Sequence, residues 1–325
     1  MNGDAADSVR DTNNESLTLV YADATKGWLA VEEGTGFVGE NYIVASGGTE
    51  TTCGNFKIHT FTGPGTFTVS SLADTPSNNN VDYLVAAGGG GGASQHSGGG
   101  GAGGLRFSAS TFTAPCTAAP RAGTAITVTA TSFPITVGGG GAARPGTSSP
   151  TGACSQGNSG NPSTFSTITS TAGGGGGGYG SAPRWLGLAG GSGGGGGSQC
   201  GTGGSGNTLP ISPSQGNDGG DGGPSIFTGG GGGGAGAVGA DSGPPQAGNG
   251  GVGLQVNING TGHYWSGGGG GGSESSRTGG NGGLGGGGGG GSMPTSGTQG
   301  TGGGSALNSG ANASSGDAGA GGANT

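Results

Sequence analysis

Hydrophobic and polar residues alternate in several short runs within the first 87 residues of the chain. The runs lie at residues 17–21, 42–44, 56–62, 66–69 and 81–85. Successive side chains of a strand point to opposite faces, so runs of this kind predict β-strands. The Gly63-Pro64-Gly65 connection between two of the runs predicts a hairpin. We expect the core of this region to form from Phe56, Ile58, Phe67, Val69, Tyr83 and Val85.

From residue 88 onward the alternation gives way to blocks of glycine. Residues 88–325 contain 86 of the 96 glycines, and Leu, Ile, Val and Phe together number only 42 in the 325 residues. A conventional apolar core cannot be built from so few large side chains. Eight blocks of similar length recur, at 88–92, 98–101, 138–141, 173–178, 193–197, 229–234, 267–272 and 285–291.

Two interpretations of the glycine blocks compete. Chains rich in Gly, Ser and Pro with few apolar residues are typical of disordered linkers. The near-constant block length, and the strand-like runs at 126–128 and 254–258 between blocks, favour an ordered structure instead. Polyproline-II geometry has three residues per turn and no internal hydrogen bonds. Glycine helices of this shape can therefore approach closely and bond to one another sideways.

The predicted fold is mostly β and irregular. N-terminal β-strands are followed by a stack of polyglycine-II helices joined by loops, with essentially no α-helix. We expect a β-rich attachment region at 1–49, a hairpin and strand entry at 50–87 and the glycine-rich domain at 88–325. If only the eight blocks cross the stack, successive loops alternate between its ends. Loops 93–97, 142–172 and 198–228 then share one end, and loops 179–189 and 237–266 share the other. If the shorter Gly-rich stretches at 201–206, 216–223 and 248–253 also cross the stack, this assignment shifts after residue 200.

Charge and hydropathy exclude several function classes. The net charge is −8, with 6 Arg and 2 Lys, so the chain lacks the basic face that binding to nucleic acid requires. No run of 18 apolar residues is present, so we expect no membrane insertion. The polar, acidic start at Met1-Asn2-Gly3-Asp4 lacks the apolar stretch of a secretory signal. Synthesis is therefore expected to end in the cytosol.

Catalytic motifs are weak against the glycine background. Gly190-Gly191-Ser192-Gly193-Gly194 matches the nucleophile-elbow pattern but lacks the predicted strand before it and the helix after it. No lysine follows Lys57, and the three histidines are far apart in the sequence. We expect no enzyme activity and no cofactor.

Metal ligands and disulfides have no clear pattern either. Cys53, Cys116, Cys154 and Cys200 form no C-x-x-C pair. Four cysteines allow two bridges in three ways, but in a reducing cytosol we favour free buried thiols. The segment 217–223 (NDGGDGG) faintly resembles a calcium-binding repeat, yet it occurs once, and we interpret it as a capped turn.

The order of these segments resembles the glycine-rich domain of tailed-phage tail fibres and receptor-binding adhesins. The resemblance rests on the succession 56–62, 65–69, 81–88 and 98–106, and continues at 135–139, 163–166 and 264–267. Residues 23–28 also resemble the stretch that commonly precedes this domain in marine phage fibres. The family implies a polyglycine-II sandwich whose loops bind host surface receptors, protein or polysaccharide. It also implies a virion protein made in the host cytoplasm, with other tail-fibre subunits as partners and a homotrimer left open.

Aromatic and basic residues in loops are the candidate receptor-binding residues, because such side chains commonly dominate recognition. One group comprises Tyr179, Arg184 and Trp185, in a loop stiffened by Pro183; a second comprises His263, Tyr264 and Trp265. A structural role, in which Trp185 covers the flank of the stack or the second group packs against a glycine block, remains open for both. Loop 93–97 is interpreted as a plain turn. The alternative function is a glycine-rich extracellular scaffold that forms filaments.

Overall fold

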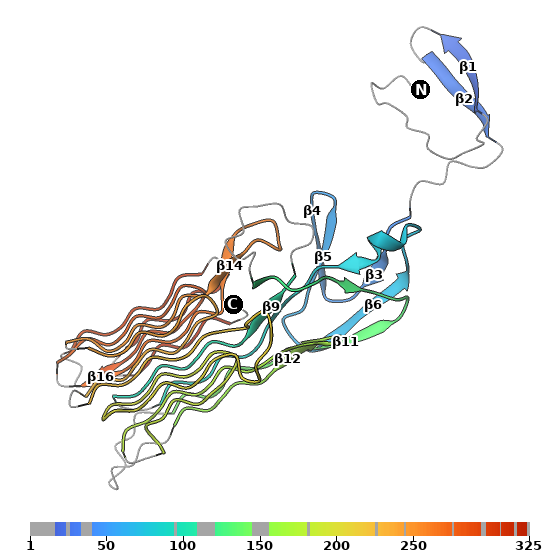
Figure 1. Ribbon diagram of the computed structural model, residues 1–325. Helices are drawn as coiled ribbons and strands as arrows, with labels where there is room; N and C mark the ends of the chain where they lie inside the picture. Colours follow the sequence, from blue (N-terminus) through green and yellow to red (C-terminus); the bar gives the residue numbers. More distant parts are fainter. Residues whose placement is uncertain are drawn as a thin grey trace.

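The structure is a computed structural model, shown in Figure 1. It describes residues 17–23, 27–33, 41–93, 96–108, 121–144, 156–180, 183–224, 227–243, 245–274, 276–293, 297–305, 307–314 and 317–323. Over these residues the chain forms short strands and extended segments without α-helix, and a 3₁₀ turn, η1 (Pro76–Asn78), lies between β6 (Gly65–Ser71) and β7 (Asn80–Val81). The expected fold, mostly β and irregular without α-helix, is confirmed.

The strands are short and mostly antiparallel. Two N-terminal strands, β1 (Leu17–Asp23) and β2 (Gly27–Glu33), pair with each other. The remaining strands are β3 (Val44–Ser46), β4 (Thr49–Cys53), β5 (Phe56–Thr60), β6 (Gly65–Ser71), β7 (Asn80–Val81), β8 (Leu84–Ala86), β9 (Leu105–Phe107), β10 (Ile126–Thr127), β11 (Ser132–Thr136), β12 (Ser163–Phe165), β13 (Ile168–Ser170), β14 (Leu254–Val256), β15 (His263–Trp265), β16 (Ser273–Glu274) and β17 (Ser292–Met293).

A five-stranded antiparallel sheet, in the order β13-β12-β11-β6-β3, closes one end of the glycine-rich stack. Phe67 and Val69 of β6 and Val128 are buried together, and Phe133 and Phe165 of the neighbouring strands pack against them. The Phe67 and Phe165 rings meet edge to face, with centroids 6.0 Å apart. Apolar side chains on one sheet face thus supply the conventional core that the glycine segments lack.

The hairpin predicted between residues 56–62 and 66–69 is wrong. β5 pairs with β4 through a turn at Gly54, whereas β6 pairs with β3 and β11. Phe56 therefore lies on a hairpin that projects from the sheet, and 48% of its surface is exposed. Phe67, Val69, Tyr83 and Val85 are buried as expected. The strand at 49–53 was missed because its sequence, TETTC, has no large apolar residue.

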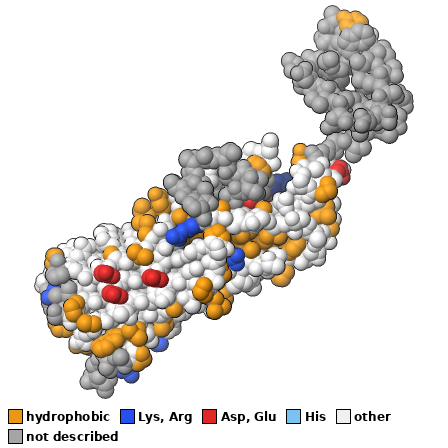
Figure 2. All heavy atoms as spheres, in the orientation of Figure 1, with side chains coloured by type: hydrophobic (Ala, Val, Ile, Leu, Met, Phe, Trp, Pro, Cys, Tyr) orange, Lys and Arg blue, Asp and Glu red, His pale blue; other side chains and the backbone are white. Residues whose placement is uncertain are grey.

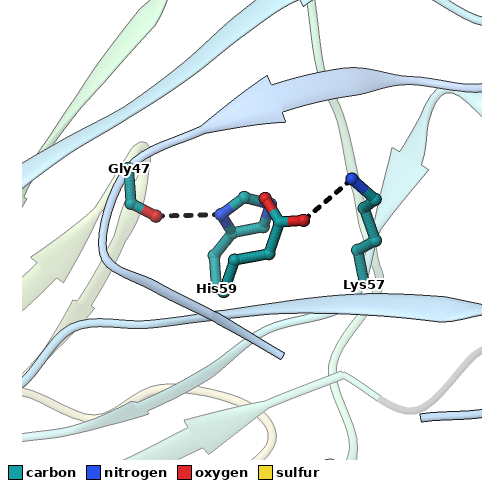
Figure 3. Close-up of polar contacts among 4 residues, drawn as sticks. Gly47, Lys57 and His59 are labelled. Atoms are coloured by element: carbon teal, nitrogen blue, oxygen red, sulfur yellow. Dashed lines mark hydrogen bonds and ion pairs between the residues drawn. The ribbon is translucent and has the colours of Figure 1, made fainter. Parts of the chain in front are cut away.

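Polar side chains hold the β4–β5 hairpin in place (Figure 3). The Nδ1 atom of His59 donates to the carbonyl oxygen of Gly47 at 2.9 Å, and the His59 ring meets that of Phe67 edge to face. Lys57 Nζ donates to the carboxylate of Glu50 at 2.8 Å, which lowers the pKa of Glu50. Both groups of the Lys57–Glu50 pair are solvent-exposed, so the pair contributes little to stability.

The rest of the domain is a slab of extended segments, here called spans, that run back and forth side by side (Figure 1). Residues 98, 101 and 104 donate their N–H groups to an antiparallel span at residues 171–177, each at 2.8 Å. Residues 99 and 102 donate instead to a parallel span at 230–233, at 3.0 and 2.9 Å. Consecutive N–H groups thus point to different neighbouring spans, and every third one points to the same span. This period of three is expected of packed polyglycine-II helices.

Glycine is required inside the slab because a side chain would collide with the neighbouring backbone. A Cβ atom at Gly175 would lie 1.9 Å from the carbonyl oxygen of Gly157, and one at Gly231 would lie 1.9 Å from that of Asn249. At Gly139, on the outermost span, nothing lies within 4 Å of the same position. The need for glycine therefore ends at the surface of the slab.

Asp and Asn side chains complete the hydrogen bonds of one outer row of spans. Such spans lack a neighbour on one side, and a buried or half-buried N–H group without a partner is costly. An Oδ1 atom of the adjacent span accepts the N–H group in each case. The pairs are Gly206 to Asp218, Gly203 to Asp221, Asp221 to Asp241, Asn281 to Asn249, Thr301 to Asn281 and Gly302 to Asn312, at 2.7–2.9 Å.

This arrangement corrects the interpretation of residues 217–223 as a capped turn. Gly220 and Gly222 donate N–H groups to Gly231 and Gly201 of two different neighbouring spans, both at 2.8 Å. The segment therefore crosses the slab. Its two aspartates are spaced by three residues because every third residue of a span faces the same side.

Candidate functional site

The two ends of the slab differ. The base is the end beside the five-stranded sheet, where β9 and β14 lie, and the tip is the opposite end, where the loops carrying His96, Tyr179, Phe227 and Glu274 lie (Figure 1). At the base, Leu105, Phe107, Ala235 and Val256 form a buried cluster. No comparable apolar cluster occurs at the tip among the described residues, so loops there are held mainly by polar and ring contacts.

Three rings from distant parts of the sequence meet at the tip. The ring of His96 lies 5.1 Å from that of Tyr179 and 5.3 Å from that of Phe227, and the rings of Tyr179 and Phe227 are 6.5 Å apart. The contacts between these rings are tilted or edge to face, the geometries that aromatic pairs prefer. The slab thus brings three loops that are far apart in the sequence to one place.

The meeting of these rings shows that the predicted grouping of loops was wrong. Loops 93–97 and 179–189 were expected at opposite ends, yet His96 and Tyr179 are in contact. The error arose because spans are not confined to glycine blocks. Gly157 and Gly160 donate their N–H groups to Gly176 and Gly173, at 2.8 and 3.1 Å, so the stretch 157–161 within the expected loop 142–172 is itself a span.

Backbone hydrogen bonds tie the tip loops together. Ser198 donates its N–H group to the carbonyl oxygen of His96 at 3.1 Å, and Glu274 donates to that of Phe227 at 3.0 Å. The Ser97 hydroxyl closes its own loop by donating to Ala93 at 2.6 Å. The tip is therefore a connected surface rather than a set of independent loops.

His96 is the most buried ionisable side chain of the tip. Only 7% of its side chain is exposed, and Nε2 lies 3.2 Å from the carboxylate of Glu274. Burial lowers the pKa of His96, because the charged ring would lose its hydration; nearby Arg277 lowers it further, and Glu274 opposes the shift. The φ angle of +28° places His96 in a backbone region that non-glycine residues rarely adopt. Loop 93–97 is therefore not the plain turn that was expected.

The candidate residues Tyr179, Arg184 and Trp185 all lie at the tip, but their environments differ. Tyr179 packs against His96, whereas Arg184 is exposed and Trp185 is half-buried. The carbonyl oxygens of Arg184 and Trp185 accept N–H groups from Gly178 and Gly197, at 2.8 and 2.7 Å. The backbone of this loop is thus fixed by the slab while the Arg184 side chain extends into solvent.

The second candidate group lies at the base. His263, Tyr264 and Trp265 form β15, which pairs with β14. Trp265 packs against the buried base cluster and donates its Nε1–H to Val256 at 3.2 Å, and its ring contacts that of His263. The side chain of Tyr264, which is 36% exposed, points to the opposite face of the strand. The structure therefore does not bring the two candidate groups together.

Sequence reasoning missed four residues of the tip: His96, Phe227, Arg144 and Gln156. Gln156 Nε2 donates to the carbonyl oxygens of Leu186 and Pro183, at 2.8 and 3.3 Å, and links two loops. None of the four belongs to a recognisable sequence motif, so no local pattern marks it. Only the number and direction of the spans would have placed them together.

Residues considered for chemistry are dispersed. Ser192 is fully buried within a span, where its N–H group donates to Ala102. Among the described residues no group of three or more His, Cys, Asp or Glu side chains could hold a metal ion. Cys53 is half-buried and Cys200 exposed, both as free thiols, so the expected burial is wrong for these two. Cys116 and Cys154 lie outside the described residues.

Comparison with known proteins gives one match. A family described as a glycine-rich domain matches residues 60–324. No curated protein and no solved structure matches the chain significantly. Among the described residues, no helix has the length and apolar character needed to cross a membrane.

Proposed function

Because the chain belongs to the glycine-rich domain family, we propose that it is a tailed-phage tail-fibre component that attaches the virion to a host-cell surface receptor through the loops at its tip. The order of strand and glycine segments that resembles phage adhesins supports this assignment. Attachment of this kind is binding without chemistry, with neither a cofactor nor a metal taking part. In the virion, other tail-fibre subunits would hold the opposite end of the chain.

One observation carries the proposal: the slab gathers loops from distant parts of the chain on one surface. His96, Tyr179, Phe227 and Glu274 meet at the tip although they come from four different connections. Each loop begins and ends on a span whose backbone is hydrogen-bonded to its neighbours. Loops on a rigid scaffold can change in sequence without loss of the fold, as in other recognition domains.

Binding of the purified chain to bacterial cells tests the proposal. Fluorescently labelled chain should bind cells of the phage host and should reduce adsorption of the phage when added in excess. The double variant Arg184→Ala and Trp185→Ala should bind several-fold less while its melting temperature stays within a few degrees of the parent.

A matched control is Ser205→Ala combined with Leu209→Ala, at exposed positions toward the base of the slab. This control should bind as well as the parent. Failure of the parent chain to bind any host cell, together with long filaments in electron micrographs, would favour the extracellular scaffold instead.

A further inference from the structure

Charged residues divide the glycine-rich part into two halves of opposite sign. Residues 83–217 contain four arginines and neither Asp nor Glu, whereas residues 218–325 contain five acidic residues and one arginine. The segments 145–155 and 181–182 carry no charged residue in the sequence. Any basic surface formed by the first half is therefore free of competing carboxylates from its own loops.

Two of the four arginines are used within the base. Arg106 donates to the carbonyl oxygen of Thr169 at 3.4 Å. Arg121 donates to the carbonyl oxygen of Ala235 and to Oδ1 of Asn217, the latter at 3.1 Å. These two guanidinium groups satisfy backbone and amide acceptors of neighbouring spans at the base, whereas Arg144 and Arg184 lie at the tip.

Arg144 and Arg184 lie at one corner of the tip and are joined through Gln156. Arg144 donates from Nε to the carbonyl oxygen of Gln156 at 3.3 Å and from Nη2 to Oδ1 of Asn158 at 3.2 Å. The Gln156 amide bonds to the backbone on both sides of Arg184 and Trp185. The basic corner is defined here as Arg144, Gln156, Asn158, Arg184 and Trp185.

The two arginines of the basic corner are exposed, and within the described residues neither has an acidic partner. Among the described residues the ion pairs are Lys57–Glu50 and His96–Glu274, neither of which involves them. Exposed Asn158, Ser159 and Asn161 extend the surface along the adjoining span. Figure 2 shows basic side chains at the tip, and the acidic side chains gather separately on the flank of the slab.

We propose that the basic corner binds an acidic polysaccharide, a proposal that deepens, and rests on, the proposed attachment function. Guanidinium groups match carboxylate, phosphate and sulfate groups through paired N–H donors. The neighbouring amide and hydroxyl groups of Gln156, Asn158 and Ser159 suit the hydroxyl groups of the sugar rings. The half-buried Trp185 offers an apolar edge beside the two charges.

A second copy of the chain fits the basic corner less well. Asp218, Asp221 and Asp241 already accept backbone N–H groups of their own slab, and Glu274 faces His96. Held in this way against their own slab, these carboxylates do not extend toward Arg144 and Arg184 of another copy. The same carboxylates repel a polyanion from the flank, so an acidic polysaccharide is directed to the corner.

Binding of defined polysaccharides by the full chain tests the proposal. The probes are alginate, which carries carboxylates, dextran sulfate, which carries sulfates, and neutral dextran. We expect calorimetry to show binding of one or both anionic polymers and none of dextran, with affinity falling at least tenfold from about 20 mM to about 300 mM salt. Comparing alginate with dextran sulfate identifies which anionic group is preferred.

Charge reversal locates the site. The double variant Arg144→Glu and Arg184→Glu should weaken binding of the anionic polymer at least tenfold, whereas Lys57→Glu, at another exposed basic residue on the β4–β5 hairpin, should change it less than twofold. Thermal melting checks that both variants fold. If the double variant fails to fold, wild-type binding that is insensitive to salt would overturn the proposal instead.

Other outcomes separate this proposal from attachment itself. Equal binding of dextran and alginate, or full binding by the folded double variant, would overturn it. So would a concentration-dependent dimer in light scattering that the double variant abolishes, since that result identifies a second copy as the partner. Host-cell binding that survives the double variant contradicts only the polysaccharide; absence of host-cell binding by the parent contradicts the attachment function.

Discussion

Asp221 donates its backbone N–H group to the Oδ1 atom of Asp241, 2.7 Å away on the neighbouring span. The carboxylate of Asp221 in turn accepts the N–H group of Gly203 on the other side. On each outer span a side-chain oxygen thus accepts the N–H group that a backbone carbonyl oxygen accepts in the interior. The outer Asp and Asn residues are therefore part of the hydrogen-bond network between spans.

Removal of one such oxygen should destabilise the slab. Asp221→Ala leaves the N–H group of Gly203 without its acceptor and should lower the free energy of unfolding by about 1 kcal/mol, because the site is exposed to water. Asp221→Asn keeps an oxygen at the same place and should cost less than half as much. Urea denaturation measures both, and equal losses in the two variants would contradict the role.

Substitution by alanine should destabilise the chain strongly at an interior glycine and very little at an outer one. Gly231→Ala places Cβ 1.9 Å from the carbonyl oxygen of Asn249 and should destabilise the chain by at least about 3 kcal/mol, or prevent folding. Gly139→Ala meets nothing within 4 Å and should change stability by less than about 0.5 kcal/mol. Thermal melting of the two variants decides the matter, and similar melting temperatures would count against close packing.

Acid should weaken the tip through His96. The folded protein holds this ring neutral to a lower pH than the unfolded chain, whose histidine takes up a proton near the ordinary pKa of 6.5. Below pH 6.5 the unfolded state therefore binds more protons, and stability falls as the pH drops, by at most about 1.4 kcal/mol per pH unit.

The variant His96→Phe keeps the ring contacts with Tyr179 and Phe227 but cannot be protonated. Its melting temperature should fall less between pH 7 and pH 5 than that of the parent. Because the charges of Glu274 and Arg277 also act on the His96 ring, both residues are left unchanged in the parent and in the variant. Identical pH profiles for the parent and the variant would show that His96 is not the titrating group.

Hydrogen exchange should reveal the slab directly. The N–H groups of residues 98, 99, 101, 102 and 104 are bonded to spans on two sides, so their exchange requires cooperative opening and should be slow. Amides of exposed tip loops, such as the one at Arg184, should exchange faster. Uniformly rapid exchange across residues 98–104 and 229–234 would show that the glycine segments are not stacked.

The sequence was sufficient to predict the polyglycine-II principle but not the path of the chain. Blocks such as 229–234 reveal where interior spans lie, because only glycine fits there. Spans such as the one at 157–161 have side chains on their outer side and resemble loops in the sequence. Missing them reverses the direction of every later crossing, which is why Tyr179 was assigned to the wrong end.

The candidate site was predictable only in part. Arg184 and Trp185 stood out because they are rare residue types grouped in one loop. His96 and Gln156 act by contacts with loops that lie far away in the sequence, and neither carries a local signal. The outer aspartates were visible as a motif but were given the wrong meaning, since their spacing of three follows the turn of the span.

The period of three residues also determines how the chain can change length. Inserting one residue within a span turns everything beyond it by about 120°, which carries side chains such as that of Asp221 into the interior and glycines to the surface. Deletions have the same effect in the opposite sense. Insertions that preserve the fold must therefore come in threes or fall in the connections at the base and tip, so the surface proposed for host attachment is also where the protein can gain or lose residues most freely.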